Sequence, residues 1–445
     1  MILACLSAKN AKKTMGRKWM AKKAILSSFR PDPDFSGLAI LRRLSIRETR
    51  RLLLWLDQSG LALYFLRKLQ TAEATTLLGI ELRDELEQRL FRNRQRTNDL
   101  LEEFKHLSLS FCAFDVPVAA LKGFTLVPDY CPEPHLRHQT DFDFLVEPRY
   151  VDAAAIALQT CGYTTEHLTK SGESCFTTPL QHVPSRADDL YAVQRQRQVD
   201  LHTSLWEECA WISLEHPSDC MNHRQPRILQ DIRFDALSPE DAFIFQVFHS
   251  FRHTFRSWIR VSWLLEISRF LLAHQEDENF WARVTARAGR SEGTRRIFAF
   301  VLELTSHLFE CPVPHPLSRW VAGALPDSVH SWFEQFSVRW ILSDWPGSLL
   351  NIFLATDFIQ DHELRTEYWK SRLLPGKAQL TIGKIRSSNR NMQREARNAR
   401  WQYVAHRSAK HFGNVLSLPL NQIRWILAQR LTRSHSIESQ YEITR

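Results

Sequence analysis

The two flanks of the chain have apolar residues at helical spacing. Apolar side chains recur every third or fourth position over 45–70 and 81–111, which predicts helices in both stretches. A longer helical pattern runs from residue 237 to about residue 370. Ser238 is a suitable N-cap for its first helix, with Asp241 at the third helical position. We therefore expect helical regions on both sides of the middle of the chain.

Between these regions the pattern changes to that of strands. The run VPVAALKG, 116–123, is short and apolar and ends in a glycine, and DFDFLVEP, 141–148, alternates acidic and apolar side chains before a proline. The stretch 150–163 predicts a helix that ends at Gly162, and 168–189 predicts a loop or an irregular hairpin. The predicted fold class is α+β, with a small mixed-sheet core between helical regions.

The chain has 445 residues, which exceeds one ordinary core, so several structural units are expected. The changes of pattern divide it into a basic leader without predicted packed structure (1–30), a helical lead-in (31–105), an α/β core (106–235), a helical domain (236–375) and a basic helical tail (376–445).

The net charge of +9 is concentrated at the two ends. Seven Lys and Arg lie in the first 23 residues, and twelve Lys and Arg against three acids follow Leu380, so the middle carries about −7. A basic total therefore does not make the core basic. The tail could contact nucleic acid or an anionic membrane surface, and a solvated helix face explains the same charges equally well.

Several classes of protein are excluded by the composition. No apolar run reaches the roughly 18 residues that a membrane-spanning helix needs. Eight scattered cysteines form no C-x-x-C pair, and the basic N-terminus lacks the apolar segment of a signal peptide. We expect a cytoplasmic protein, with the inner membrane face as an alternative location through the tail. P-loop and dinucleotide-binding glycine motifs are absent from the sequence.

Two aspartates of DFDFLV carry the candidate chemistry. On a strand, Asp141 and Asp143 share one face while Phe142 and Phe144 point into a core. Asp200, within QVDLH, is a third acid on a predicted strand. Three carboxylates suit Mg²⁺ or Mn²⁺ when substrate phosphates supply further ligands. The alternative for an isolated D-x-D is an edge strand with one solvated face.

Other residues near these acids could contribute to a site. Gly123 would let the backbone approach a phosphate, and Lys122 and Arg137 could add positive charge, although a plain turn and a surface arginine explain these residues as well. His249 and His253 share a helical face at metal-ligand spacing. A zinc-protease motif is absent there, so we interpret them, like His202, as structural or substrate-facing.

Together, VPVAALKG, the R-x-x-x-DFDFLV motif from Arg137, the helix ending in CGY, and VDLH resemble an uncharacterised nucleotidyltransferase family found near bacterial surface-polysaccharide gene clusters. That family belongs to the superfamily with the polymerase β type fold. The similarity extends from about residue 95 to about residue 310, through LSPEDAFIFQVFHSFRH and WIRVSWLLEISRF. It implies that 106–235 is the nucleotidyltransferase core.

The resemblance also implies residue roles. Asp141, Asp143 and Asp200 would bind the metal and act in catalysis, and Lys122 and Gly123 would lie at the phosphate-binding turn. The sequence departs from the superfamily where Phe124 replaces a glycine or serine. The spacing from Gly123 to the first aspartate is also long, and Glu266 stands where an aspartate is common. These departures concern the phosphate contact more than the metal site.

Three functions remain open at this point. The first is a Mg²⁺-dependent transfer of a nucleoside monophosphate from an NTP to a hydroxyl of an unknown acceptor, which could be protein, glycan, lipid-linked sugar or RNA. The second is a D-x-D glycosyltransferase that uses a nucleotide sugar, although it leaves LKG and VDLH unexplained. The third is a catalytically degenerate nucleotide-binding scaffold, which Phe124 keeps open.

Overall fold

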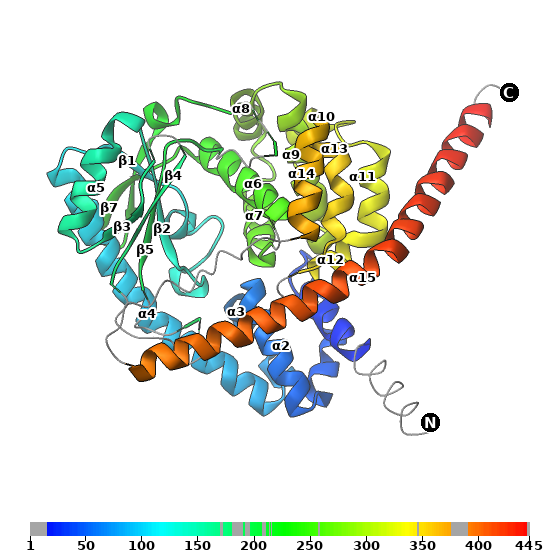
Figure 1. Cartoon of the computed structure of the whole chain (residues 1–445), viewed down its shortest axis with the longest axis horizontal. Helices are drawn as coiled ribbons and strands as arrows, with labels where there is room; N and C mark the ends of the chain where they lie inside the picture. Colours follow the sequence, from blue (N-terminus) through cyan, green and yellow to red (C-terminus); the bar gives the residue numbers. More distant parts are fainter. Residues whose placement is uncertain are drawn as a thin grey trace.

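The structure is a computed structural model, and it places a mixed sheet beside a large helical region (Figure 1). It describes residues 16–169, 172–179, 190–191, 196–206, 211–212, 214, 216–256, 259–344, 347–374 and 390–442. The predicted α+β class is confirmed. Among the described helices, none has both the length and the apolar character needed to span a bilayer.

The sheet has seven strands in the order β3-β4-β5-β2-β1-β7-β6. The β2–β5 and β1–β7 pairs are parallel and the other pairs are antiparallel. The strands are β1 (Val118–Ala120), β2 (Asp141–Val146), β3 (Thr164–His167), β4 (Glu173–Thr177), β5 (Gln198–His202), β6 (Gln225–Leu229) and β7 (Ile232–Ala236).

Two helices, α4 (Ile80–Ala113) and α5 (Val151–Thr160), cover one face of the sheet, and most of the other helices form a separate hydrophobic core. The helices before and within the sheet are α2 (Ile46–Ser59), α3 (Ala62–Thr71), α4 and α5. Those after it are α6 (Pro239–Arg256), α7 (Val261–Ala273), α8 (Glu278–Ala288), α9 (Glu292–Phe309), α10 (His315–Val321), α11 (Asp327–Trp332), α12 (Val338–Ile341), α13 (Ala355–Phe358), α14 (His362–Leu373) and α15 (Arg390–Glu442).

Alternation along β2 decides which face of the sheet is covered by α4 and α5. Phe142 and Phe144 stack on Phe104 of α4, with ring centroids 6.0 and 5.8 Å apart. The same core includes Leu158 of α5 and Val199 of β5. The opposite face of the sheet is directed toward α6 and α7 (Figure 1). The carboxylates of β2 and β5 therefore lie between the sheet and the helical region.

The predicted helix end at Gly162 is present, since α5 stops at Thr160 and Gly162 has φ +84°. Part of 168–189 is strand β4, which pairs with β3 through an irregular register, so the hairpin alternative describes this part. Residues 180–189 lie outside the described residues. The β6–β7 hairpin was not predicted, although RIL and IRFDA flank the two-residue turn at Gln230.

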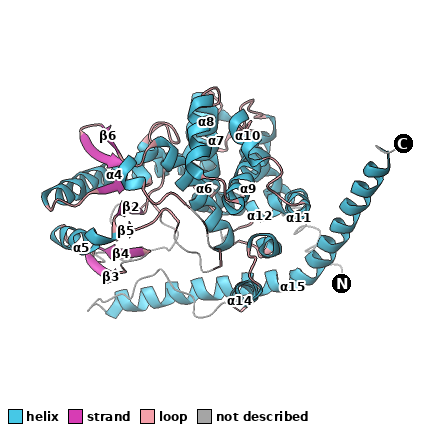
Figure 2. Cartoon of the chain, turned by 90° about the horizontal axis from the view of Figure 1, so that it is seen from above, coloured by secondary structure: helices cyan, strands magenta, loops and turns pink. Residues whose placement is uncertain are grey.

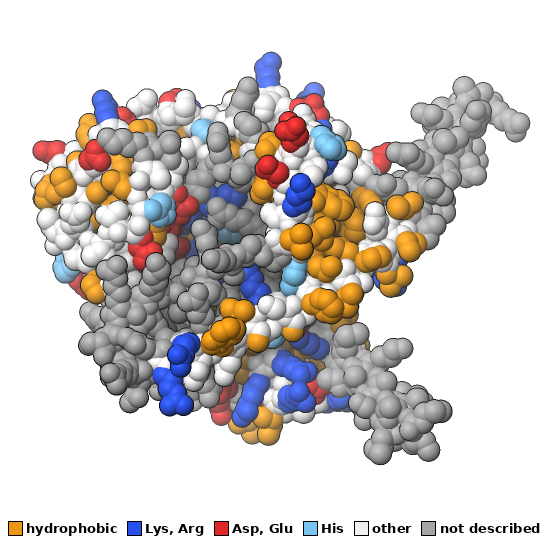
Figure 3. Space-filling view, in the orientation of Figure 1, with side chains coloured by type: hydrophobic (Ala, Val, Ile, Leu, Met, Phe, Trp, Pro, Cys, Tyr) orange, Lys and Arg blue, Asp and Glu red, His pale blue; other side chains and the backbone are white. Residues whose placement is uncertain are grey.

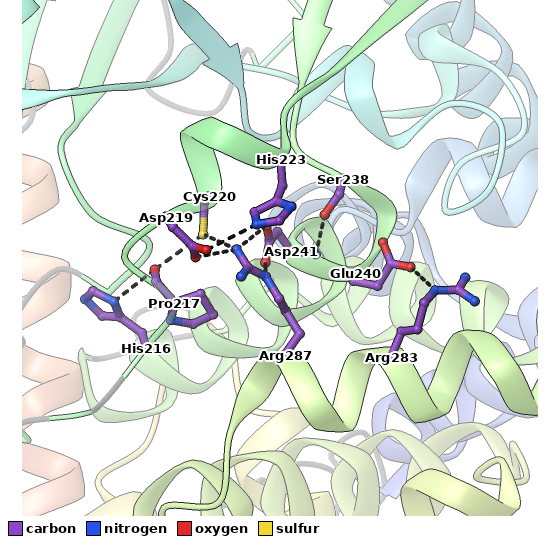
Figure 4. Close-up of polar contacts among 10 residues, drawn as sticks. All are labelled: His216, Pro217, Asp219, Cys220, His223, Ser238, Glu240, Asp241, Arg283 and Arg287. Carbon is purple, nitrogen blue, oxygen red and sulfur yellow. Dashed lines mark hydrogen bonds and ion pairs between the residues drawn. The ribbon is translucent and has the colours of Figure 1, made fainter.

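The expected cap at the start of α6 is confirmed, because the Asp241 amide donates to Ser238 Oγ at 3.2 Å. The Asp241 carboxylate pairs with Arg287 of α8 at 2.8 Å, and Arg287 also pairs with Asp219 at 2.7 Å (Figure 4). This network joins α6 to α8 and to the segment before β6. Its members are all paired with one another, so we interpret the network as structural.

Residues 16–27, within the basic leader, form a helix that packs on the helical region. Ile25 is fully buried, and Lys22 Nζ donates to the Leu342 carbonyl at 2.6 Å and pairs with Asp344 at 2.8 Å. The charge pattern alone does not predict this packing. Its physical source is the apolar face that Ala21 and Ile25 provide between the lysines.

The basic tail contains the long helix α15, which runs along one side of the molecule (Figure 2). Trp425 packs against Phe336 and Phe353, each with a centroid distance of 5.8 Å. His411 contacts the Leu373 carbonyl at 2.9 Å. These contacts hold the middle of α15 against the helical region.

Candidate active site

The three predicted carboxylates converge at one point of the sheet. Strands β2 and β5 pair in parallel with Asp143 opposite Asp200 and Asp141 opposite Gln198. Carboxylate oxygens of Asp141, Asp143 and Asp200 all lie within 4.8 Å of one another. Asp143 and Asp200 are buried, whereas Asp141 is half-buried. The register of two parallel strands thus brings Asp200 to two acids that lie 57 and 59 residues before it in the chain.

This donor set fits a hard divalent cation. Two ligand oxygens on one Mg²⁺ can be at most about 4.2 Å apart, from metal–oxygen distances of about 2.1 Å. The observed separation of up to 4.8 Å is close to that limit, so small rotations of the side chains suffice. The residues Asp141, Asp143 and Asp200 could therefore hold Mg²⁺ or Mn²⁺, with phosphate oxygens as further ligands.

Asp143 has two partners at the same oxygen. Lys122 Nζ lies 2.8 Å and His202 Nε2 lies 3.0 Å from Asp143 Oδ1. Burial opposes ionisation of this carboxyl, but the Lys122 ammonium and the His202 ring hold the pKa of Asp143 well below its ordinary value. Asp143 is thus a carboxylate with a fixed orientation, and Lys122 supplies a positive charge where a metal ion would also bind.

Asp200 has the opposite electrostatic environment. Burial, followed by the charges of Asp143 and Asp141, raises the pKa of Asp200 to about 7. The Gln198 amide nitrogen donates to both carboxylate oxygens, at 2.9 and 2.8 Å, and limits this increase. The site therefore contains more negative charge than its own side chains neutralise, which favours a bound cation.

The turn after β1, which contains Gly123, packs against protein side chains and is not an open phosphate-binding loop. Gly123 has φ +67°, and a Cβ atom there would lie 2.5 Å from the Gln139 amide. Gln139 in turn donates to the Asp141 carbonyl at 2.9 Å. The chain continues through this turn as the short 3-10 helix Gly123–Leu126 (η3). Gly123 is therefore required for the packing of Gln139 beneath Asp141.

Phe124 has a packing role on the other face of the sheet. Its ring lies 5.4 Å from Phe104 and 6.5 Å from Phe142, between centroids. The side chain is buried and directed away from the carboxylates. A phenylalanine at this position fills the core beneath the site, and a hydroxyl group there would not reach a substrate on the opposite face.

Arg137 lies beside the carboxylates but pairs with the helical region. Its Nε is 3.1 Å from Glu266 Oε1, which also accepts a hydrogen bond of 2.8 Å from the Tyr64 hydroxyl. Glu266 is only 1% exposed. This buried pair connects the segment before β2 to α7 and α3. Glu266, which departs from the family pattern, thus holds the sheet against the helices.

Helix α6 presents Phe245, His249 and His253 to the site. The two histidine rings are 4.6 Å apart, and each lies within 4.6 Å of the Trp263 ring of α7. Lys122 Nζ lies 5.8 Å from the Phe245 ring. Burial, then the neighbouring Lys122 charge, lowers the pKa of His249 well below its ordinary value. The metal-ligand cluster found among the described residues includes neither histidine, and their rings pack on each other and on Trp263.

Sequence reasoning did not identify Gln139, Gln198 or Arg260. Each glutamine lies two residues before an aspartate, in QTD and QVD, and the strand period puts Gln198 on the same face as Asp200. That spacing is a usable signal. Arg260, whose Nη1 donates to the His138 carbonyl at 3.2 Å, has no local signal because only tertiary packing brings α7 to β2.

A mixed sheet with three carboxylates on adjacent strands has the donor arrangement of enzymes that transfer phosphorus-containing groups with divalent metals. The sequence model of one family, described as uncharacterised nucleotidyltransferase, matches residues 46–310. This is more than half of the chain, and the protein belongs to that family. The match begins before residue 95 and includes α2 and α3. No curated protein and no solved structure matches the chain.

Proposed function

We propose that this protein is a Mg²⁺- or Mn²⁺-dependent nucleotidyltransferase that moves a nucleoside monophosphate from an NTP to a hydroxyl of an acceptor. The observation that supports this proposal best is the convergence of Asp141, Asp143 and Asp200 on adjacent strands. Family membership supports the reaction class. An NTP is the substrate that both observations imply.

Each side chain has a definite role in this proposal. Bound divalent metal would neutralise the phosphate oxygens and lower the pKa of the acceptor hydroxyl. Asp141 and Asp143 supply metal ligands, and Lys122 and His202 fix the orientation of Asp143. Asp200, oriented by Gln198, accepts the hydroxyl proton. The acceptor oxygen then forms a bond to the α-phosphorus, and pyrophosphate leaves with the bridging oxygen.

A glycosyltransferase that uses a nucleotide sugar is the main alternative, since D-x-D also binds a metal against a diphosphate. It gives no role to Asp200 on the parallel neighbour of β2, which contacts the same site. Thermal unfolding with Mn²⁺ distinguishes the two, because NTPs should raise the melting temperature more than nucleotide sugars do. The opposite order would favour the glycosyltransferase.

The third alternative is a degenerate nucleotide-binding scaffold. Its sequence basis was Phe124, whose ring packs in the core on the other face of the sheet. If no nucleotide raised the melting temperature in the presence of Mg²⁺ or Mn²⁺, the scaffold would be favoured. The acceptor could be a protein, glycan, lipid-linked sugar or RNA, and the exposed arginines of α15 could bring an anionic acceptor or membrane surface close to the enzyme.

The proposal is tested by metal-dependent NTP turnover, or by labelling of the protein itself, in the purified protein. Asp143→Ala should abolish this activity while the circular dichroism spectrum remains that of a folded protein. Glu147→Gln is the matched control, because Glu147 follows the same strand but pairs with Arg149 on the surface. Equal turnover by Asp143→Ala and the wild type would reject the proposal. If the wild type is active, mass spectrometry of its labelled product would identify the acceptor.

A further inference from the structure

An arginine at the start of α7 makes no ion pair with a described carboxylate. Arg260 is the N-cap residue of α7, and no side chain caps this helix. Its guanidinium donates to the His138 carbonyl at 3.2 Å and lies 5.9 Å from the Trp263 ring. Of the described carboxylates, none lies within 4.0 Å of it. Arg137 nearby differs, because Glu266 neutralises it.

The charge of Arg260 is unfavourable in the protein alone. Burial, followed by the neighbouring Arg137 charge, lowers its pKa, and Asp141 opposes this change. The side chain is half-buried, and a partly desolvated guanidinium without a carboxylate partner favours an approaching anion. Two contacts nevertheless orient the guanidinium, the hydrogen bond to the His138 carbonyl and the Trp263 ring beside it. The fold therefore holds a guanidinium near the carboxylates without an ion pair to any described carboxylate.

Arg260 and Lys122 lie at opposite ends of the carboxylate row. Lys122 contacts Asp143, whereas Arg260 donates to the carbonyl of His138, three residues before Asp141. The two aspartates are about 7 Å apart along the strand, from a rise of about 3.3 Å per residue. A row of ring contacts links the two cations: Lys122 lies near the Phe245 ring, Phe245 near His249, His249 near Trp263, and Trp263 near Arg260. Lys and Arg side chains are visible in the hollow between the sheet and the helices (Figure 3).

We infer that Arg260 binds the β- and γ-phosphates of the nucleotide, facing Asp141 across the site. This inference rests on the proposed function and adds a specific residue for the polyphosphate. When the acceptor oxygen bonds to the α-phosphorus, the bridging oxygen keeps its electron pair and pyrophosphate leaves. The guanidinium then neutralises the charge that develops on that leaving group, while the acceptor proton goes to Asp200. A planar guanidinium suits two phosphate oxygens at once.

The test measures inorganic tripolyphosphate binding by calorimetry, with Mn²⁺ present, in wild type and Arg260→Met. We expect the variant to bind tripolyphosphate about ten- to a hundredfold more weakly, as for lost hydrogen bonds to a charged group. Mn²⁺ binding without phosphate, followed by its electron paramagnetic resonance signal, should be unchanged. Arg260→Lys should give an intermediate affinity. Arg283→Met is the control, because Arg283 pairs with Glu240 on the surface (Figure 4).

A purely structural role of Arg260 predicts a different result. Loss of its contact with the His138 carbonyl would then lower the melting temperature of Arg260→Met and leave tripolyphosphate binding unchanged, which would overturn the inference. We expect a melting temperature close to that of the wild type, because Arg260 is half-buried and makes one hydrogen bond to a carbonyl and no ion pair with a described carboxylate. If Arg260→Met does not fold, wild-type affinity in Arg260→Lys would overturn the bidentate contact. Wild-type protein that binds neither Mn²⁺·ATP nor tripolyphosphate would reject the proposed function itself.

Discussion

Asp143 and Asp200 face each other on adjacent strands, yet neutralising them should have opposite effects on stability. The pKa of Asp200 is raised from 3.8 to about 7 by burial and by the two other aspartates. Each pKa unit is worth about 1.4 kcal/mol, so ionised Asp200 costs the metal-free fold up to about 4 kcal/mol. Asp200→Asn should therefore stabilise the metal-free protein, since Asn can still accept a hydrogen bond from Gln198.

The sign of the pH dependence follows from the direction of the shift. Because the folded pKa of Asp200 exceeds the unfolded value, the wild type loses stability as pH rises from about 4 to about 7. The advantage of Asp200→Asn should thus be roughly 2 kcal/mol at pH 5 and reach its full value above pH 7.

Asp143→Asn should destabilise the same protein. It leaves the Lys122 ammonium, whose side chain is only 10% exposed, without its partner at 2.8 Å. Loss of one member of a buried pair costs roughly 3–5 kcal/mol. Both variants should lose the stabilisation that Mg²⁺ gives to the wild type.

The assay is urea unfolding in EDTA at pH 5 and pH 8, followed by circular dichroism, with Glu147→Gln as a control expected within about 0.5 kcal/mol of the wild type. The reasoning would be refuted if Asp200→Asn were less stable than the wild type at pH 8, or if its advantage did not change with pH.

Two further substitutions test the packing behind the site. Gly123→Ala and Gly162→Ala both place alanine at a positive φ, which costs roughly 1–2 kcal/mol of stability. Only Gly123→Ala also displaces Gln139, so urea unfolding should show the larger loss of stability for this variant. Equal losses would contradict the close contact between Gly123 and Gln139. Glu266→Leu should cost roughly 3–5 kcal/mol because it leaves Arg137 buried and unpaired, and Arg137→Met in the same protein should recover part of this loss; additive losses would contradict the pair.

Strand β2 could be predicted from the sequence because its acidic and apolar residues alternate, which is the period of a strand with one buried face. Phe142 and Phe144 must enter a core, and the strand then exposes Asp141 and Asp143 together on the other face. The sequence also indicated Asp200 as a third carboxylate on a strand, but it did not show which strands are neighbours, because local spacing does not determine strand order. The structure supplies it through the parallel β2–β5 register.

Other features depend on contacts between distant segments. Arg260 comes close to the carboxylates only because α7 packs beside the segment before β2. Its own neighbourhood in the sequence therefore gave no signal. Glu266 and Tyr64 likewise meet across 202 positions of the chain. Phe124 was interpreted as a missing phosphate contact, whereas its burial is decided by Phe104 of α4. The β6–β7 hairpin had alternating residues, but the two strands are short and polar.

The central claim is tested most directly by the position of the phosphorus that is transferred. The purified protein is incubated with Mg²⁺ and an NTP labelled at either the α- or the γ-phosphate, and the labelled product is separated from free nucleotide. We predict that the α-label is transferred and the γ-label is released as pyrophosphate, and that EDTA or Asp200→Asn abolishes the transfer. Transfer of the γ-label, or α-label transfer that persists in both EDTA and Asp200→Asn, would contradict nucleotidyl transfer at the three aspartates.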